Sequence, residues 1–228
     1  MNTVLDAKHK SSYIKSMNRL DTKTRAQILH MLCEGMSMRA ISRLTGASFN
    51  TVSKLMIDAG KACAAYHDEN VTGLTSKRVE CDEIWSFTYS KQKNVKTAKS
   101  APEGAGDTWT WTALDADSKL IVSYLVGGRD NRYANAFMDD VASRLTTRVQ
   151  MTTDGHKAYL EAVEGAFGCD VDYAQLVKMY GKSSESAKGR YSPASCTGIK
   201  KIPVTGNPDE KLVSTSYVER QNLTMRMH

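Results

Sequence analysis

The sequence predicts an α/β protein, a mixed sheet with flanking helices, preceded by a small all-helical domain. Three observations favour this class. Residues 21–62 show helical periodicity in three short pieces. From residue 79 onward, segments rich in β-branched and aromatic residues alternate with amphipathic helical segments. No apolar run approaches the roughly 20 residues that a membrane-spanning helix needs, so we expect no membrane partner.

Charge is unevenly placed along the 228 residues, whose net charge is +6. Residues 1–80 carry 12 Lys/Arg against 7 Asp/Glu, residues 81–174 carry 10 against 14, and residues 175–228 carry 9 against 4. The pattern is consistent with ordinary surface variation, or with basic ends that meet a polyanion and central acids that hold cations. Five scattered cysteines without a C-x-x-C pair indicate a reducing cytoplasm.

The N-terminal part, residues 1–75, predicts a helix-turn-helix domain and linker. Ser37 and Ser48 are expected N-caps, Gly46 the turn glycine and Gly60 the end of the last helix. A plain three-helix bundle that touches no DNA is the alternative. The polar, acid-free start of the second helix favours DNA binding. The expected DNA contacts of this domain are Arg39, Arg43, Asn50, Thr51, Ser53 and Lys54.

The segment "KRVECDEIWSFTY" opens the second domain, residues 76–228, as a strand. Two acids, Asp82 and Glu83, lie inside it and must point to opposite faces. An acid in mid-strand is costly to bury unless it is paired or binds metal, although surface acids on edge strands are common.

The remaining elements follow in order. "TWTWTALDADSKLIVSYLVGG" predicts a hairpin in which Asp115 and Asp117 are turn residues. "NRYANAFMDDVASRLTTR" predicts an amphipathic helix, and "VQMTTDGHKAYLEAVEGAFG" a strand ending at Asp154 and then a helix. "VDYAQLVKMYG" predicts another strand, and a final helix carries Glu219.

This order fits the ribonuclease-H-like fold, in which an acid of the first strand lies beside an acid at the end of the fourth. Asp82, Asp154 and Glu219 occupy the positions of the three acids of that architecture. Divalent cations relieve the repulsion among such carboxylates, and oxygen ligands suit Mg²⁺ or Mn²⁺. Two ions together can activate a nucleophilic oxygen and stabilise the leaving oxygen of a phosphodiester.

Glu219 has two interpretations from its local sequence. Ser216 and Glu219 have the S-x-x-E spacing of a capping box, which would leave Glu219 to satisfy a backbone N–H. Glu219 is alternatively one of the metal-binding carboxylates.

The motifs "CDEIWSF", "TTDGHKAY" and "STSYVERQNLTMRMH", in this order, resemble the DDE transposases of bacterial insertion sequences, the insertion-sequence-one type above all. The resemblance covers residues 79–228. It implies a metal-dependent nuclease and strand transferase that acts on the ends of its element, with two Mg²⁺ or Mn²⁺ ions. It implies Asp82, Asp154 and Glu219 as the catalytic and metal-binding residues.

The expected partner is double-stranded DNA, both the terminal inverted repeats of the element and the target. We expect a homo-oligomer when active, in the bacterial cytoplasm with the nucleoid. Asn222 and Arg226 share a helix face with Glu219 and are expected to contact DNA. No Tyr or Ser nucleophile is needed, so Tyr159 and Tyr217 are interpreted as core or groove residues. His156 either positions a water or is structural.

Residues 181–213 are rich in Ser, Gly, Pro and Lys and form a basic loop insert. The insert is either disordered or a loop–hairpin clamp on DNA, and the retained aromatic and aliphatic anchors favour the clamp. The clamp's expected phosphate contacts are Lys188, Arg190, Tyr191, Lys200 and Lys201.

Two features depart from the family. Many members carry a cysteine-rich zinc element before the helix-turn-helix, and most continue beyond "NLTMRMH" with basic helix. The sequence is therefore also consistent with a truncated or frameshifted copy that binds DNA but cuts weakly. Two rivals are a helix-turn-helix regulator with a non-catalytic second domain, and a repair or RNA-processing nuclease on the same fold.

Overall fold

The computed structural model describes residues 20–181 and 195–227. They form two compact units, and the first ends at Glu69 in the chain. Within these residues, no helix combines the length and the apolar character that crossing a membrane requires.

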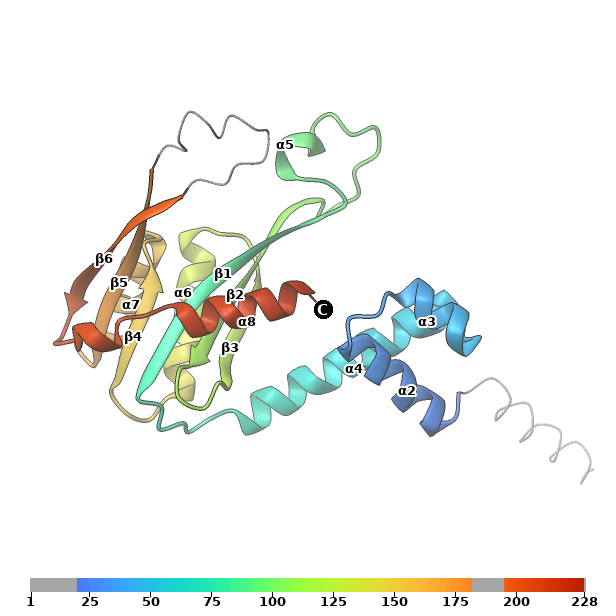
Figure 1. The fold of residues 1–228 in the computed structure, drawn as a ribbon, viewed down its shortest axis with the longest axis horizontal. Coiled ribbons are helices and arrows are strands. Elements are labelled where there is room, and N and C mark those ends of the chain that lie inside the picture. The colour runs from blue at the N-terminus through green and yellow to red at the C-terminus, as the bar shows by residue number, and fades with distance from the viewer. Residues whose placement is uncertain (1–19, 182–194, 228) are drawn as a thin grey trace, which may run out of the picture. The chain divides into compact units, whose positions relative to one another are not determined.

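The first unit is built on three helices, α2 (Thr22–Cys33), α3 (Met38–Thr45) and α4 (Phe49–Asn70) (Figure 1). Ile28, Ile41 and Val52, one from each helix, are fully buried and belong to one hydrophobic cluster. Gly46 ends α3 with φ 71°, a left-handed conformation that glycine adopts without steric cost. Ser42 donates a hydrogen bond of 2.7 Å to the carbonyl of Ala47, which ties α3 to the turn.

The expected helix starts at Ser37 and Ser48 are confirmed. The Ser37 hydroxyl accepts from the N–H of Ala40, and the Ser48 hydroxyl accepts from the N–H of Thr51. The expected stop at Gly60 is wrong, because α4 continues to Asn70. A single glycine costs a helix only about 1 kcal/mol, which the flanking good helix formers offset.

The second unit contains a six-stranded sheet of order β3-β2-β1-β4-β5-β6. Strands β1, β2 and β3 are antiparallel neighbours, β4 and β5 run parallel to β1, and β6 is antiparallel to β5. This topology confirms the ribonuclease-H-like fold class. The strands are β1 (Arg78–Thr88), β2 (Gly106–Asp115), β3 (Ile121–Gly127), β4 (Val149–Asp154), β5 (Val171–Tyr180) and β6 (Cys196–Thr205).

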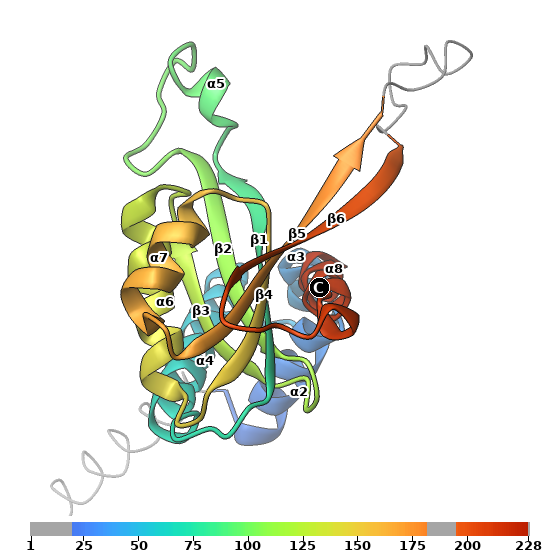
Figure 2. The ribbon, with the colours of Figure 1, turned by 90° about the vertical axis from the view of Figure 1, so that its left-hand side faces the viewer.

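Helices cover both faces of the sheet, as Figure 2 shows. On one face lie α6 (Asn131–Arg144) and α7 (Ala158–Phe167), which enclose the main core around Trp111, Phe137 and Tyr159. On the other face lies α8 (Ser216–Met227), anchored by the fully buried Val218. Two short helices, α5 (Gln92–Val95) and the 3-10 helix η2 (Glu210–Leu212), lie in the connections.

Asp115 and Asp117 lie at the turn between β2 and β3, as the sequence predicted. The Asp115 carboxylate accepts hydrogen bonds from the backbone N–H groups of Asp117 and Ser118, as turn aspartates do. Its other oxygen accepts from the Ser76 hydroxyl. Both acids are therefore structural.

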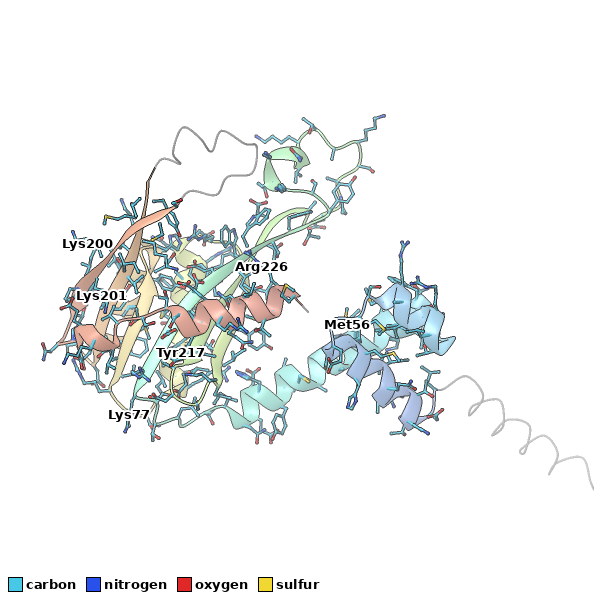
Figure 3. The ribbon with its side chains drawn as sticks, in the orientation of Figure 1. Met56, Lys77, Lys200, Lys201, Tyr217 and Arg226 are labelled. Carbon is cyan, nitrogen blue, oxygen red and sulfur yellow. The ribbon has the colours of Figure 1, made fainter. Side chains whose placement is uncertain are left out.

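The insert over residues 181–213 is not a loop throughout its described part, because residues 196–205 form β6 and extend the sheet beside β5. Lys200 is exposed on this strand, whereas the Lys201 ammonium donates a 2.5 Å hydrogen bond to the Glu210 carbonyl (Figure 3). Exposure along β6 does not alternate, and none of its residues is fully buried, so the sequence lacks the pattern that indicates a strand. Lys188, Arg190 and Tyr191 lie outside the described residues.

Gly60 and Gly46 offer a matched test of the head. Gly60 lies inside α4 with open space where a Cβ would stand, so Gly60→Ala should stabilise the protein by about 0.5–1 kcal/mol. Gly46 has equally open surroundings but a positive φ, so Gly46→Ala should destabilise it by about 1–2 kcal/mol. Urea unfolding followed by circular dichroism measures both changes. A destabilised Gly60→Ala protein would show that the helix ends where the sequence suggested.

Candidate active site

The parallel pairing of β1 with β4 brings Asp82 and Asp154 together. The register ends at Cys81 opposite Thr153, so the next residue on each strand, Asp82 and Asp154, are neighbours across the strands. Asp154 is the last residue of β4, and its Oδ1 accepts a 2.8 Å hydrogen bond from the N–H of His156. This turn fixes the carboxylate of Asp154 at the open end of the sheet.

Helix α8 brings Glu219 to the same end of the sheet, but a capping box does not hold it there. The helix start is instead capped by Glu80 of β1, whose Oε2 accepts from the N–H groups of Tyr217 (2.8 Å) and Val218 (3.0 Å). Ser216 lies inside the first turn, where its hydroxyl pairs with that of Ser214. Because Glu80 satisfies the helix terminus, the carboxylate of Glu219 is left for other partners.

The Glu219 carboxylate is bound by Lys178 of β5 and by Thr215. The Lys178 Nζ lies 2.6 and 2.5 Å from the two carboxylate oxygens, and the Thr215 hydroxyl donates to Oε1 at 2.5 Å. Asp82, Asp154 and Glu219 all line one cavity of about 590 Å³, together with Lys178 and Arg129. The structure thus gathers at one cavity the three acids that the sequence singled out.

A fourth acid, Glu83, belongs to the same cluster. Carboxylate oxygens of Asp82, Glu83 and Asp154 lie within 4.8 Å of one another. Asp82 and Glu83 point to opposite faces of β1, as alternation requires. Oxygen atoms of both nevertheless lie close to the carboxylate of Asp154, the last residue of β4, which is in register with Leu176 of β5. The Glu83 side chain is only 1% exposed and lies 3.3 Å from Nη2 of Arg129, which is 3.7 Å from Asp154.

Crowding of these carboxylates raises their affinity for protons. Burial, followed by the charge of Asp154, raises the pKa of Asp82 to about 6. The same two causes raise the pKa of Glu83 to about 7, against the opposing charge of Arg129. The deprotonated cluster is therefore short of positive charge at neutral pH, despite Arg129 and Lys178.

The donor set fits a divalent cation of the Mg²⁺ or Mn²⁺ class. All the ligands on offer are carboxylate oxygens, which hard cations prefer. In addition, Oε1 of Glu83 is buried without a hydrogen-bond partner among the described residues, and such an acceptor is costly unless a cation or water satisfies it. Asp82, Glu83 and Asp154 form one candidate ligand group, and Glu219 lines the same cavity as Asp82 and Asp154.

The remaining residues that the sequence singled out lie on or beside α8 and the cavity, or in the core. Asn222 is buried, and its Nδ2 donates a 2.9 Å hydrogen bond to Oδ2 of Asp82, so it orients that carboxylate instead of reaching a DNA phosphate. Tyr159 is a fully buried core residue, while Tyr217 is 42% exposed beneath the Lys119 ammonium. His156 lines the cavity, and burial lowers its pKa. Arg226 is exposed in the last turn of α8 (Figure 3).

The expected DNA contacts of the head lie on α3 and α4. Ser53 is half-buried, and Lys54 pairs with Asp58 one turn further along α4 at 2.9 Å. The Thr51 hydroxyl bonds that of Ser48. The exposed members of the expected set are Arg39, Arg43, Asn50, Thr51 and Lys54.

Sequence reasoning missed three residues that surround the acids, Glu80, Arg129 and Lys178. It also did not assign Glu83 to the site. Glu83 carried a signal, since an acid in mid-strand is costly to bury. Lys178 carried a weaker one, as the lone basic residue of the strand "VDYAQLVKMY". Glu80 and Arg129 gave none, because their partners lie far along the chain.

The raised pKa of Glu83 predicts how stability depends on pH in the presence of a chelator. Between the ordinary pKa of 4.5 and about 7, the folded state keeps a proton that the unfolded state releases, so stability falls as pH rises through this window. Glu83→Gln removes this loss, on the order of 3 kcal/mol at most. Its melting temperature should exceed the parent's at pH 8 and match it at pH 5.

Glu103→Gln, at an exposed position, is the control for this experiment and should change neither value. An equal difference between Glu83→Gln and the parent at both pH values would show that Glu83 is not titrating in this range.

Comparison with protein-family models gave no match, and no curated protein matched the sequence. Among solved structures, the cryo-EM structure of the piggyBac transposase synaptic complex with hairpin DNA aligns with a TM-score of 0.36 and 10% identity. The alignment covers 77% of this chain and 46% of that chain, so the chain spans about half the length of that transposase. The fold class rests on the strand order described above.

Proposed function

We propose that this chain is a transposase that cleaves DNA strands and transfers them, using divalent metal ions held by Asp82, Asp154 and Glu219. The observation that carries the proposal is that three acids from three separate elements, β1, β4 and α8, line one cavity. A protein that only bound DNA would have no need to gather them, because clustered carboxylates destabilise the folded state and repel phosphate.

The neighbouring cations fit the same chemistry. Arg129 and Lys178 line the cavity and now offset the carboxylates. With divalent ions held by the acids, the guanidinium and the ammonium would be free to hold the oxygens of a DNA phosphate. Bound ions supply a Lewis acid and an activated water or 3′-OH at this position.

The roles of the other residues follow from their contacts. Asn222 positions Asp82 through its side-chain amide, and Glu80 positions Glu219 by holding the start of α8. No side chain is required as a covalent nucleophile, since the same site serves hydrolysis at the element's end and attack of the freed 3′-OH on target DNA. The helical head would bind duplex DNA of the terminal repeats through α3 and α4.

The carboxylates are tested by Asp82→Asn, Asp154→Asn and Glu219→Gln. Each substitution removes a metal-binding charge while keeping side-chain size. Loss of a residue that only supports a metal ligand typically reduces activity by about 10- to 100-fold. Each of these substitutions removes a ligand itself, so each should reduce nicking of a supercoiled plasmid with Mn²⁺ or Mg²⁺ by more than that. Binding of duplex DNA should be unchanged.

Asp139→Asn, at an exposed position of α6, is the matched control. Nicking at the parent rate by any one of the three variants would remove that residue from the site. Absence of nicking by the parent itself, with duplex binding intact, would favour the regulator or the truncated copy. Cutting without preference for the repeats would favour a repair or RNA-processing nuclease.

The head is tested by Lys54→Gln. If the ammonium contacts one phosphate, the slope of log affinity against log salt should become shallower by about 0.9, with weaker binding at all sequences. Lys61→Gln, two turns further along the same helix and also exposed, should keep the parent slope. The same slope for Lys54→Gln and parent would place Lys54 outside the DNA interface.

A further inference from the structure

A line of aromatic and cationic side chains leads from the cavity along β1 and β2. Arg129, which lines the cavity, places its guanidinium carbon 4.5 Å from the ring centre of Trp109. Trp109 is the register partner of Trp85, whose ring centre lies 5.7 Å from that of Phe87. Lys91 Nζ lies 5.1 Å from the ring of Trp85. We call these five residues the aromatic track.

The track emerges from the protein core toward solvent. Every second residue of a strand points to the same face, so Glu83, Trp85 and Phe87 share one face of β1. Trp109 and Trp111 share one face of β2 for the same reason. Trp111 is fully buried, Trp85 and Trp109 are half-buried, and Phe87 is 48% exposed. The rings therefore pass in series from the carboxylate cluster to the surface.

Beyond Phe87, β1 and β2 lead into an excursion of residues 89–105 that projects from the sheet (Figures 1 and 2). It contains four exposed lysines and one acid, Glu103. Its base is fixed by a reciprocal pair, since the N–H of Gln92 donates to Asp107 at 2.9 Å and the N–H of Asp107 donates to Gln92 at 3.4 Å. The lysines are Lys91, Lys93, Lys96 and Lys99.

Tyr89 begins the excursion in an unusual backbone conformation. Its φ is 66°, which is sparsely populated by bulky residues, and its side chain is 56% exposed. Strain of this kind persists where the surrounding structure enforces it, and it clusters at ligand-binding positions.

We propose that the aromatic track, the exposed ring of Tyr89 and the lysines of the excursion bind an unpaired DNA strand that leads away from the cleavage site. The proposal rests on the proposed function of the cavity. Aromatic rings stack on the faces of nucleobases, and lysines hold the phosphates between them. In a duplex each base face is covered by its neighbours, so rings in series can be used only by unpaired nucleotides. Arg129 joins the cavity to the first ring.

This assignment predicts DNA ends that are frayed or single-stranded beside the cut. It also explains why aromatics accompany the lysines, because a surface that met only duplex phosphates would need the positive charge alone.

The test measures binding of a fluorescein-labelled oligodeoxythymidine of roughly 12 nucleotides, within the size range of single-strand sites, and of a duplex of the same length. Fluorescence anisotropy with excess EDTA keeps the result independent of metal and of cutting. Phe87→Ala and Tyr89→Ala should each weaken single-strand binding by about 5- to 100-fold and change duplex binding less than about twofold. The head contributes equally to parent and variants, so its binding cancels.

Tyr124→Ala, at a 44% exposed position of β3 outside the track, is the matched control and should bind as the parent does. Circular dichroism melts establish that each variant is folded. The double variant Lys93→Gln/Lys96→Gln, with both substitutions at exposed positions, provides a second measurement. The slope of log single-strand affinity against log salt should become shallower by about 1.4.

Unchanged single-strand affinity in Phe87→Ala and Tyr89→Ala would overturn the proposal, as would equal losses for single strand and duplex. The proposal would also be overturned if Phe87→Ala or Tyr89→Ala changed the sedimentation of the protein from dimer to monomer and left strand binding unchanged. That result would assign the surface to a second copy of this chain. Strand binding is measured in EDTA and needs neither metal nor cutting, so failure of the nicking prediction with intact, Phe87-dependent strand binding would count against the cavity and not the track.

Discussion

Electrostatic repulsion among Asp82, Glu83, Asp154 and Glu219 is the constraint around which the second unit is organised. Asp82, Asp154 and Glu219 line one cavity, and Glu83 lies buried close to Asp82 and Asp154. The protein offsets these carboxylates with the guanidinium of Arg129, the ammonium of Lys178 and the amide of Asn222. The offset is incomplete, because Asp82 and Glu83 still have pKa values raised to about 6 and 7. A folded protein keeps such a destabilising arrangement where function requires it, and divalent cations are the partners that relieve it.

The fold holds this cluster together through a few specific contacts. Parallel register places Asp82 beside Asp154, and the buried Glu80 holds the start of α8 so that Glu219 reaches the cavity. Burial raises the pKa of Glu80, and the two N–H groups that it accepts from favour its charged form against that cost. Val218 anchors the same helix in the core. The catalytic proposal thus depends on rigid elements and not on loops, which suits a site that must hold ions in register.

Local patterns predicted the elements, and long-range contacts account for what they missed. Period-two alternation and turn residues identified β1 to β5, and the motif positions of Asp82, Asp154 and Glu219 were sufficient to expect that they meet. The capping box was wrong because the competing cap, Glu80, lies more than a hundred positions away in the sequence and is invisible to a local motif. Gly60 was misread since one glycine does not outweigh a long run of helix formers. Glu83 joins the cluster through Arg129 and Asp154, which lie 46 and 71 positions further along the chain, and alternation along β1 does not reveal such neighbours.

The most direct test of the central claim is isothermal titration of Mn²⁺ into the protein at pH 6.5, in two buffers of different ionisation enthalpy. Because Asp82 and Glu83 hold protons near this pH, metal binding should release them, and the apparent enthalpy should differ between the buffers. The released protons should fall toward zero at pH 8.5, where both groups are already ionised. No binding of Mn²⁺ at millimolar concentration, or binding that releases no protons at pH 6.5, would contradict the account of the carboxylate cluster as a metal site.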